Sequence, residues 1–197
     1  MNTQHWRILA IDPGTRFMGV AFLDDGKLIY QAVKIIAKGQ SPQQTLQRAK
    51  DAIVRLIDDL EPNIVAVERT FFSQNRHTAL LNVLFDEIQS LARRRRLAFI
   101  SYAPSTIKKF ICGNGRAGKQ QVATVVVAKF PELKVFLTQD RAWKERFHQN
   151  MFDAVALGIM VFSSRSQLLQ KVRNPRFTST VAPAAGRWRR CDPSAPA

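Results

Sequence analysis

The first 36 residues constrain the fold of this chain more than any other segment. They contain three β-strand patterns in close succession, over residues 8–12, about 18–23 and about 27–36. Asp25-Gly26 separates the last two, and this dipeptide is typical of a two-residue β-hairpin turn. The segment therefore predicts an antiparallel meander at the start of the fold.

Helix and strand patterns alternate through the following 120 or so residues. Pro42 opens a helical pattern that runs to Leu60, and the short apolar run IVAVE at residues 64–68 is typical of a strand buried on both faces. Four further helices are expected: over about 76–95, a short one that starts at Pro104, and over 120–130 and 151–162. One further strand is expected over 97–102. This order predicts an α/β fold with a mixed five-stranded sheet and helices on both faces.

The charge of the chain is strongly basic. It has 30 Lys and Arg against 15 Asp and Glu, a formal net charge of +15, and an isoelectric point near 10.7. Such an excess is typical of proteins that bind nucleic acid, although a generic basic surface has the same signature. Residues 165–197 hold seven Lys and Arg and one acid. We expect one domain over 1–163 and a disordered basic tail over 164–197.

Two cysteines, Cys112 and Cys191, exclude a disulfide scaffold and a cysteine-based zinc site. Apolar runs are too short to span a membrane, and the N-terminal residues enter a strand pattern without an apolar signal segment. These features favour a reducing, cytoplasmic location.

Three acids lie where burial is expected. Asp12 and Glu68 each end an apolar strand, and Asp153 lies in an apolar helix. Buried carboxylates are costly and repel one another unless a divalent cation joins them, and two such ions can promote phosphodiester hydrolysis. Each acid also has a simpler explanation: a turn at Asp12, an ion pair between Glu68 and Arg69, and a helix cap at Asp153.

Four segments resemble the RuvC type of Holliday junction resolvase, within the RNase H-like nucleases. They are IDPGTRFMGVAFL, VAVERTFFSQN, YAPSTIKKFICGNGRAGKQQV and NMFDAVALGIM, and the resemblance covers roughly residues 8–162. It implies an RNase H-like fold and a metal-dependent endodeoxyribonuclease that resolves four-way DNA junctions by symmetric paired nicks.

The resemblance also implies roles for single residues. Asp12, Glu68 and Asp153 would be catalytic metal ligands for Mg²⁺, with Mn²⁺ as a substitute and two ions in each site. The family's fourth ligand, usually Asp or His, corresponds here to Asn150. An amide oxygen can coordinate Mg²⁺ but brings no charge. Gln149 is the better-placed neighbouring substitute and His148 the poorer one.

Several residues are expected to contact DNA. Lys119 corresponds to a family lysine near the scissile phosphate and Lys108 to one on the preceding helix. Lys109 and Arg116 are expected phosphate contacts, with a solvated surface as the alternative. Phe71 corresponds to an aromatic that stacks on an unpaired base, with core packing as the alternative. Gly113–Gly118 reads as a turn rather than a dinucleotide fingerprint, because a helical stretch precedes it.

Family members act as homodimers, and the leucines of the helix over 76–95 would form the interface. Leu80, Leu84 and Leu91 could instead cover the sheet. The alternatives for function are an RNase H-like nuclease for branched phage or plasmid DNA or for RNA–DNA hybrids, and a junction-binding module with weakened catalysis. A branch-migration motor complex is a possible partner in this family.

Overall fold

A computed structural model describes residues 5–69, 76–137 and 142–166, without the side chains of 76–78 and 142–146. The strands are β1 (Arg7–Asp12), β2 (Phe17–Asp24), β3 (Lys27–Ile35), β4 (Ile64–Glu68) and β5 (Ala98–Tyr102). The helices are α1 (Pro42–Leu60), α2 (Arg76–Arg94), α3 (Pro104–Cys112), α4 (Lys119–Lys129), α5 (Lys134–Leu137) and α6 (Ala142–Ser163), with a 3₁₀ turn at Pro131–Leu133. Phe71 and the tail from residue 167 onward lie outside the described residues.

The five strands form one mixed sheet in the order β3-β2-β1-β4-β5. The first three strands pair antiparallel as the predicted meander, and β4 and β5 add to β1 in parallel. Asp25 and Gly26 have φ angles of 46° and 83°, the left-handed conformation that a two-residue hairpin turn requires. The predicted five-stranded α/β architecture is confirmed.

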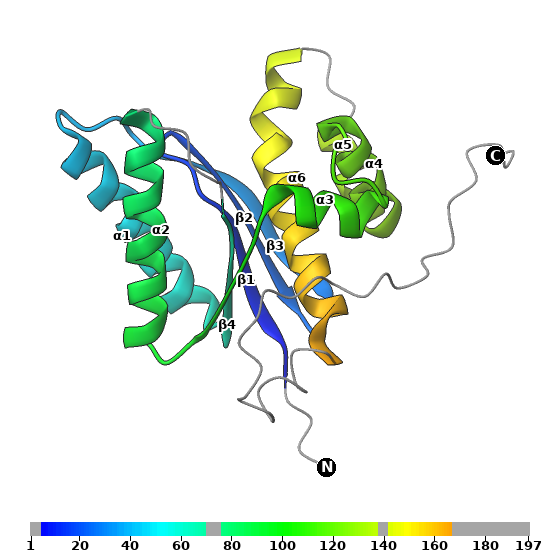
Figure 1. The fold of residues 1–197 in the computed structure, drawn as a ribbon, viewed down its shortest axis with the longest axis horizontal. Coiled ribbons are helices and arrows are strands. Elements are labelled where there is room, and N and C mark those ends of the chain that lie inside the picture. Colours follow the sequence, from blue (N-terminus) through cyan, green and yellow to red (C-terminus); the bar gives the residue numbers. More distant parts are fainter. Residues whose placement is uncertain (1–4, 70–75, 138–141, 167–197) are drawn as a thin grey trace, which may run out of the picture.

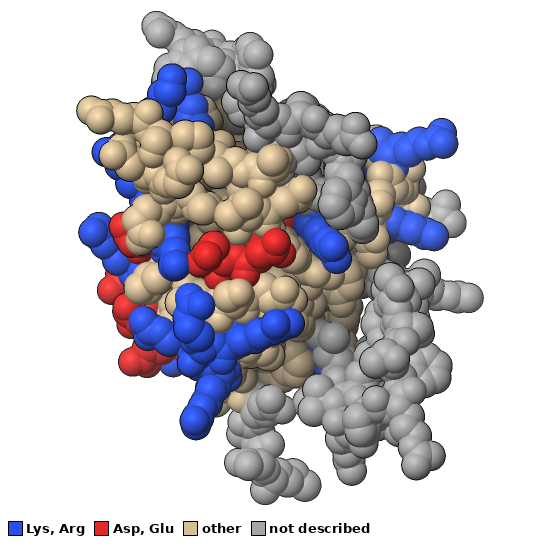
Figure 2. Space-filling view, turned by 60° about the vertical axis from the view of Figure 1, so that its left-hand side comes forward, with Lys and Arg blue, Asp and Glu red and all other residues tan. Residues whose placement is uncertain are grey.

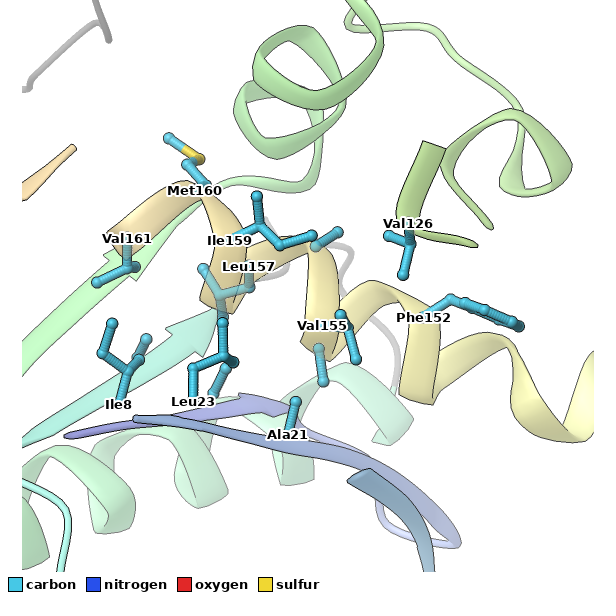
Figure 3. Close-up of a cluster of buried hydrophobic side chains, with 14 of the residues drawn as sticks. Ile8, Ala21, Leu23, Val126, Phe152, Val155, Leu157, Ile159, Met160 and Val161 are labelled. Atoms are coloured by element: carbon cyan, nitrogen blue, oxygen red, sulfur yellow. The ribbon is translucent and has the colours of Figure 1, made fainter. Parts of the chain in front are cut away.

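Helices cover both faces of the sheet (Figure 1). Successive residues of β1 point to opposite sides, so Ile8 and Ala10 enter one core and Leu9 and Ile11 the other. The core that contains Ile8 is filled chiefly by α6, α4 and α3. Figure 3 shows side chains of α6 such as Val155 and Leu157 reaching toward the strands at Ala21 and Leu23. The second core holds α1 and α2 against the sheet.

The leucines of α2 belong largely to this second core. Leu84, Ile88 and Leu91 are at most 5% exposed and pack with the strands and α1. The alternative that such residues cover the sheet is therefore confirmed for Leu84 and Leu91. Leu80 is only half-buried, and Val83 is 46% exposed on the outer side of the helix.

Helix α6 begins at Ala142, well before the apolar stretch from Met151 that predicted it. Its early turns are held by aromatic contacts from elsewhere in the chain: the rings of Phe147 and Phe17 lie 5.5 Å apart, and those of His148 and Phe136 lie 4.8 Å apart. The extension places Asp153 well inside the helix, so the explanation of Asp153 as a helix cap is wrong.

Among the helices of the described residues, none is both long and apolar enough to cross a membrane.

Candidate active site

The three expected acids converge on one pocket. Strands β1 and β4 are parallel neighbours with Ile11 opposite Val67, so the next residues, Asp12 and Glu68, end at the same edge of the sheet. Asp153 reaches this edge from α6. The pocket has a volume of about 190 Å³, and its lining comes from strand ends and from three helices: Asp12, Glu68, Pro104, Ile107, Lys108, Lys119, Val122, Asn150 and Asp153.

Gly19 explains how α6 comes so close to the strand ends. It lies on β2 directly opposite Asp12. A Cβ atom at Gly19 would lie 1.8 Å from the backbone oxygen of Asn150. Only glycine therefore lets this turn of α6 rest on β2, and the contact positions Asn150 and Asp153 beside Asp12. The two α6 residues are three apart and so project from one face of the helix.

Burial and mutual repulsion make the acids hard to ionise. Burial, followed by the negative charges of Glu68 and Asp153, raises the pKa of Asp12 well above its ordinary value. Burial and then Asp153 raise the pKa of Glu68 to about 7. Burial also raises the pKa of Asp153. Such a group of carboxylates attracts cations, since a divalent ion relieves both the desolvation and the repulsion.

Two lysines oppose these effects from the other wall of the pocket. Lys108 lies on α3, and Lys119 is the first residue of α4. The charges of both lower the pKa of Glu68 and of Asp153, against the effect of burial. Ammonium groups at these positions can also contact the oxygens of a bound phosphodiester.

Two neighbouring amides on α6 complete the site. The Asn150 Nδ2 donates a hydrogen bond to the carbonyl oxygen of Phe17 at 2.9 Å. Its Oδ1 is therefore the atom left to accept a hydrogen bond or to coordinate a metal. Gln149 is 8% exposed, and its Nε2 lies 3.4 Å from Oδ1 of Asp153. Gln149 thus contacts a pocket acid, while Asn150 lines the pocket itself.

The structure separates the expected site residues into two groups. Asp12, Glu68, Asn150, Asp153, Lys108 and Lys119 all line one pocket. Lys109 and Arg116 are exposed and do not line it. Sequence reasoning did not identify the apolar wall of Pro104, Ile107 and Val122. The helical spacing of Pro104 and Ile107, which puts both on one face of α3, is the sequence feature that could have identified this wall.

The donor set fits a hard divalent cation. Carboxylate and amide oxygens are ligands that Mg²⁺ accepts. In the described parts of the chain, a set of three such side chains with ligand atoms within 4.8 Å of one another is formed by His5, Asp24 and Asp25, and not by the three pocket acids.

The set of His5, Asp24 and Asp25 lies at the opposite end of the sheet, beside the β2–β3 turn. There His5 Nδ1 is 2.8 Å from Asp25 Oδ2. The other oxygen of Asp25 accepts a hydrogen bond from the backbone N–H of Trp6. These contacts tie the start of β1 to the hairpin turn, which accounts for the cluster without a metal.

The sequence and the fold both match characterised proteins. Residues 8–160 match the family described as crossover junction endodeoxyribonuclease RuvC. The enzyme of that name from Halorhodospira halophila is 35% identical over 126 residues, which are 62% of this chain and 75% of that protein. The one from Fusobacterium nucleatum is 27% identical over 183 residues, which are 90% of this chain and 91% of that protein.

Two solved structures support the fold. Thermus thermophilus RuvC in complex with a Holliday junction substrate aligns with a TM-score of 0.65 and 19% identity over 83% of this chain and 97% of that chain. The yeast mitochondrial Holliday junction resolvase Ydc2 aligns with a TM-score of 0.62 and 16% identity over 87% of this chain and 85% of that chain. The match over residues 8–160 shows that this chain belongs to the RuvC family of crossover junction endodeoxyribonucleases.

Proposed function

We propose that this chain is a divalent-metal-dependent endonuclease that cuts four-way DNA junctions at the pocket formed by Asp12, Glu68 and Asp153. The observation that carries the proposal is the convergence of these acids, from two strand ends and a distant helix, with Lys108 and Lys119 on the facing wall. The family of the chain supports the reaction. The net charge of +15 supports a polyanionic substrate. Figure 2 shows a face of the molecule on which Lys and Arg side chains surround a central group of acidic side chains.

The metal ligands in this proposal are Asp12, Glu68 and Asp153, with Asn150 as a neutral fourth. Mg²⁺ or Mn²⁺, when bound, would supply Lewis acidity and offset charge on the phosphodiester. The three acids would hold the cations at the edge of the sheet. Asn150 contributes an oxygen without charge, and it is not a proton acceptor at neutral pH. Gln149 restricts the orientation of the Asp153 carboxylate.

The lysines act on the substrate rather than on the metal. Lys119, at the first turn of α4, and Lys108, on α3, would hold the oxygens of the scissile phosphate and offset the charge that develops there, which their position in the pocket lining supports. Lys109 and Arg116 would contact phosphates farther along the strand. Phe71 would stack on an unpaired base near the junction centre.

A homodimer would present two such pockets to the two equivalent strands of a junction, through an interface related by two-fold symmetry. Since Leu84 and Leu91 are buried in the core, an interface on α2 would use its outer side, where Val83 is exposed. A branch-migration motor complex would be a further partner of this homodimer, and the basic tail over 164–197 would add contacts to DNA or protein.

The test is a panel of DNA substrates. We expect Mg²⁺-dependent paired nicks in a synthetic four-way junction, with much slower cutting of linear duplex and of RNA–DNA hybrid. Asp153→Asn should abolish cutting while junction binding in Ca²⁺ remains. Equal cutting of junction and hybrid would favour a broader RNase H-like nuclease, and tight junction binding without any nick would favour a binding module.

A further inference from the structure

One edge of the sheet is open along the whole of β3. Within the described residues, this strand of nine residues pairs on one side only, with β2. About half of the backbone N–H and C=O groups of such a strand point away from its partner and can pair with a further strand. Ile29 and Ile35 on β3 are 58% and 67% exposed. The edge therefore offers both the hydrogen-bonding groups and the apolar surface that an added strand needs.

Helix α6 brings the end of the described chain to the start of this edge. A Cβ atom at Gly26, in the β2–β3 turn, would meet the ring of Phe162 near the end of α6. The Arg165 guanidinium lies 4.3 Å from the centroid of the same ring. Figure 1 shows the last turn of α6, in orange, at the end of the sheet where β1 begins. The residues after 166 therefore leave the domain beside the first residues of β3.

One stretch of the tail has the composition of a strand. Residues 176–181 read RFTSTV, and aromatic and β-branched residues of this kind favour strands. Pro175 and Pro183 flank the stretch, as turn residues flank a strand. Phe177 and Val181 are four residues apart, so on a strand they would lie on one face and could cover apolar side chains of β3.

The nine residues of the linker over 167–175 favour the chain's own tail as the occupant of the edge. Fully extended, they span about 30 Å, and α6 already contacts β3, so the tail can reach the open edge. The linker carries Lys171 and Arg173, and the partly exposed carboxylates of Asp24 and Asp25 lie at the turn that it would pass. A tethered segment also has an effective concentration in the millimolar range, well above that of a second copy.

We propose that residues 176–181 pair with the open edge of β3 as a sixth strand that runs parallel to it. The direction follows from the place where the tail leaves the domain, because a chain that starts at the β2–β3 turn runs along β3 toward Ile35. Ile35 pairs with Phe17, at the edge of the sheet that holds the catalytic pocket. The added strand would therefore lead the tail from the far end of the sheet to the catalytic edge.

This path gives the basic residues near the end of the tail a position. Arg187, Arg189 and Arg190 follow the proposed strand by six to nine residues, so they would emerge at the catalytic edge. There they could contact the phosphates of a DNA arm that leaves the pocket on the β3 side. This consequence rests on the proposed nuclease function, whereas the pairing of the tail with β3 does not.

Hydrogen–deuterium exchange of the full chain tests the pairing without DNA. Successive N–H groups of a strand point to opposite sides, so the double substitution Thr178→Pro with Ser179→Pro must remove one that faces β3. We expect exchange over residues 27–35 to become about tenfold faster in this variant. Ala184→Pro with Ala185→Pro, outside the strand, is the matched control and should leave that exchange unchanged.

Two results would overturn the pairing. One is the same exchange over residues 27–35 in the unmodified protein and in both proline variants. The other is protection of β3 that increases with protein concentration, which would assign the added strand to a second copy. Faster exchange in the strand variant over residues 98–102 as well would indicate general destabilisation, and would also count against the pairing.

Junction binding in Ca²⁺ tests the position of the arginines. The triple substitution of Arg187, Arg189 and Arg190 by Gln should weaken binding about tenfold and flatten its salt dependence. Thr178→Pro with Ser179→Pro keeps every charge of the tail, yet should weaken binding by a similar factor because the arginines lose their position. Full affinity in the proline variant would overturn their delivery to the catalytic edge. An unmodified protein that neither binds nor cuts junctions would instead overturn the nuclease function, and the exchange result would stand.

Discussion

The side-chain amide of Asn150 donates a hydrogen bond to the carbonyl oxygen of Phe17 at 2.9 Å. A carbonyl oxygen accepts only, so the bond fixes the nitrogen of the amide toward β2 and leaves the oxygen for other partners. An aspartate at this position would place an oxygen against an oxygen. The hydrogen bond therefore gives a structural reason for an amide at Asn150, the proposed fourth ligand.

Asn150→Asp should lower the free energy of unfolding of the metal-free protein by about 1–3 kcal/mol, because it removes the donor to Phe17 and adds a fourth negative charge to the pocket. Mg²⁺ should restore more of this loss in the variant than in the unmodified protein, since a fourth carboxylate strengthens cation binding. Urea denaturation in EDTA and in Mg²⁺ measures both effects. Asn114→Asp is the control: Asn114 uses its oxygen as acceptor from the Arg116 N–H, and aspartate keeps that bond.

The stability of the metal-free protein should fall as pH rises from about 4.5 to about 7. Burial and Asp153 raise the pKa of Glu68 from 4.5 to about 7. The folded state therefore keeps a proton that the unfolded state releases at lower pH, so deprotonation favours unfolding throughout this window. A shift of that size corresponds to about 3 kcal/mol.

Urea denaturation at pH 5 and pH 8 in EDTA measures this fall. Glu68→Gln should reduce it, and saturating Mg²⁺ should remove most of it from the unmodified protein. Asp59→Asn, in an exposed part of α1, should behave as the unmodified protein does. A stability that rises with pH in EDTA, with Glu68→Gln making no difference, would contradict the assignment of a raised pKa to Glu68.

Gly19→Ala should destabilise the protein by about 3 kcal/mol or more, because the new methyl group would meet the backbone of α6 at Asn150. Any folded fraction should also bind Mg²⁺ more weakly, since α6 must move away from Asp12. Thermal denaturation and isothermal titration with Mg²⁺ provide the two readouts. Gly118→Ala is the comparison: the nearest atom to its Cβ would be 3.8 Å away, so a loss within about 1 kcal/mol is expected.

Lys119→Met should slow junction cutting about 100-fold while changing junction affinity by only a few fold, because the ammonium group acts mainly on charge that develops during the reaction. Lys109→Met is a matched comparison from the same basic segment, since Lys109 is exposed and does not line the pocket. Single-turnover cutting rates with saturating enzyme separate the two effects. Similar rates for both variants would place Lys119 among the general phosphate contacts.

The sequence determined the sheet and most of the acids' positions. The Asp25-Gly26 turn acts locally, because hairpin geometry depends on residues close together in the chain. The apolar runs of β1 and β4 can be recognised because a strand buried on both faces is apolar at nearly every position. For the same reason the sequence located Asp12 and Glu68 at strand ends. The resemblance to a known family pointed to Asn150 as a fourth residue beside the three acids, and Asn150 does line the same pocket.

Only the tertiary structure decided how α6 meets the sheet and which surfaces remain open. The early turns of α6 depend on contacts with Phe17 and Phe136, which no local periodicity reveals. The hydrogen bond from Asn150 to Phe17 joins residues 133 positions apart, and Leu84 and Leu91 of α2 are buried because they pack against α1 and the sheet. The sequence alone thus indicates which acids and lysines to expect at the site, whereas long-range packing brings them to one pocket and forms a second pocket beside Glu68.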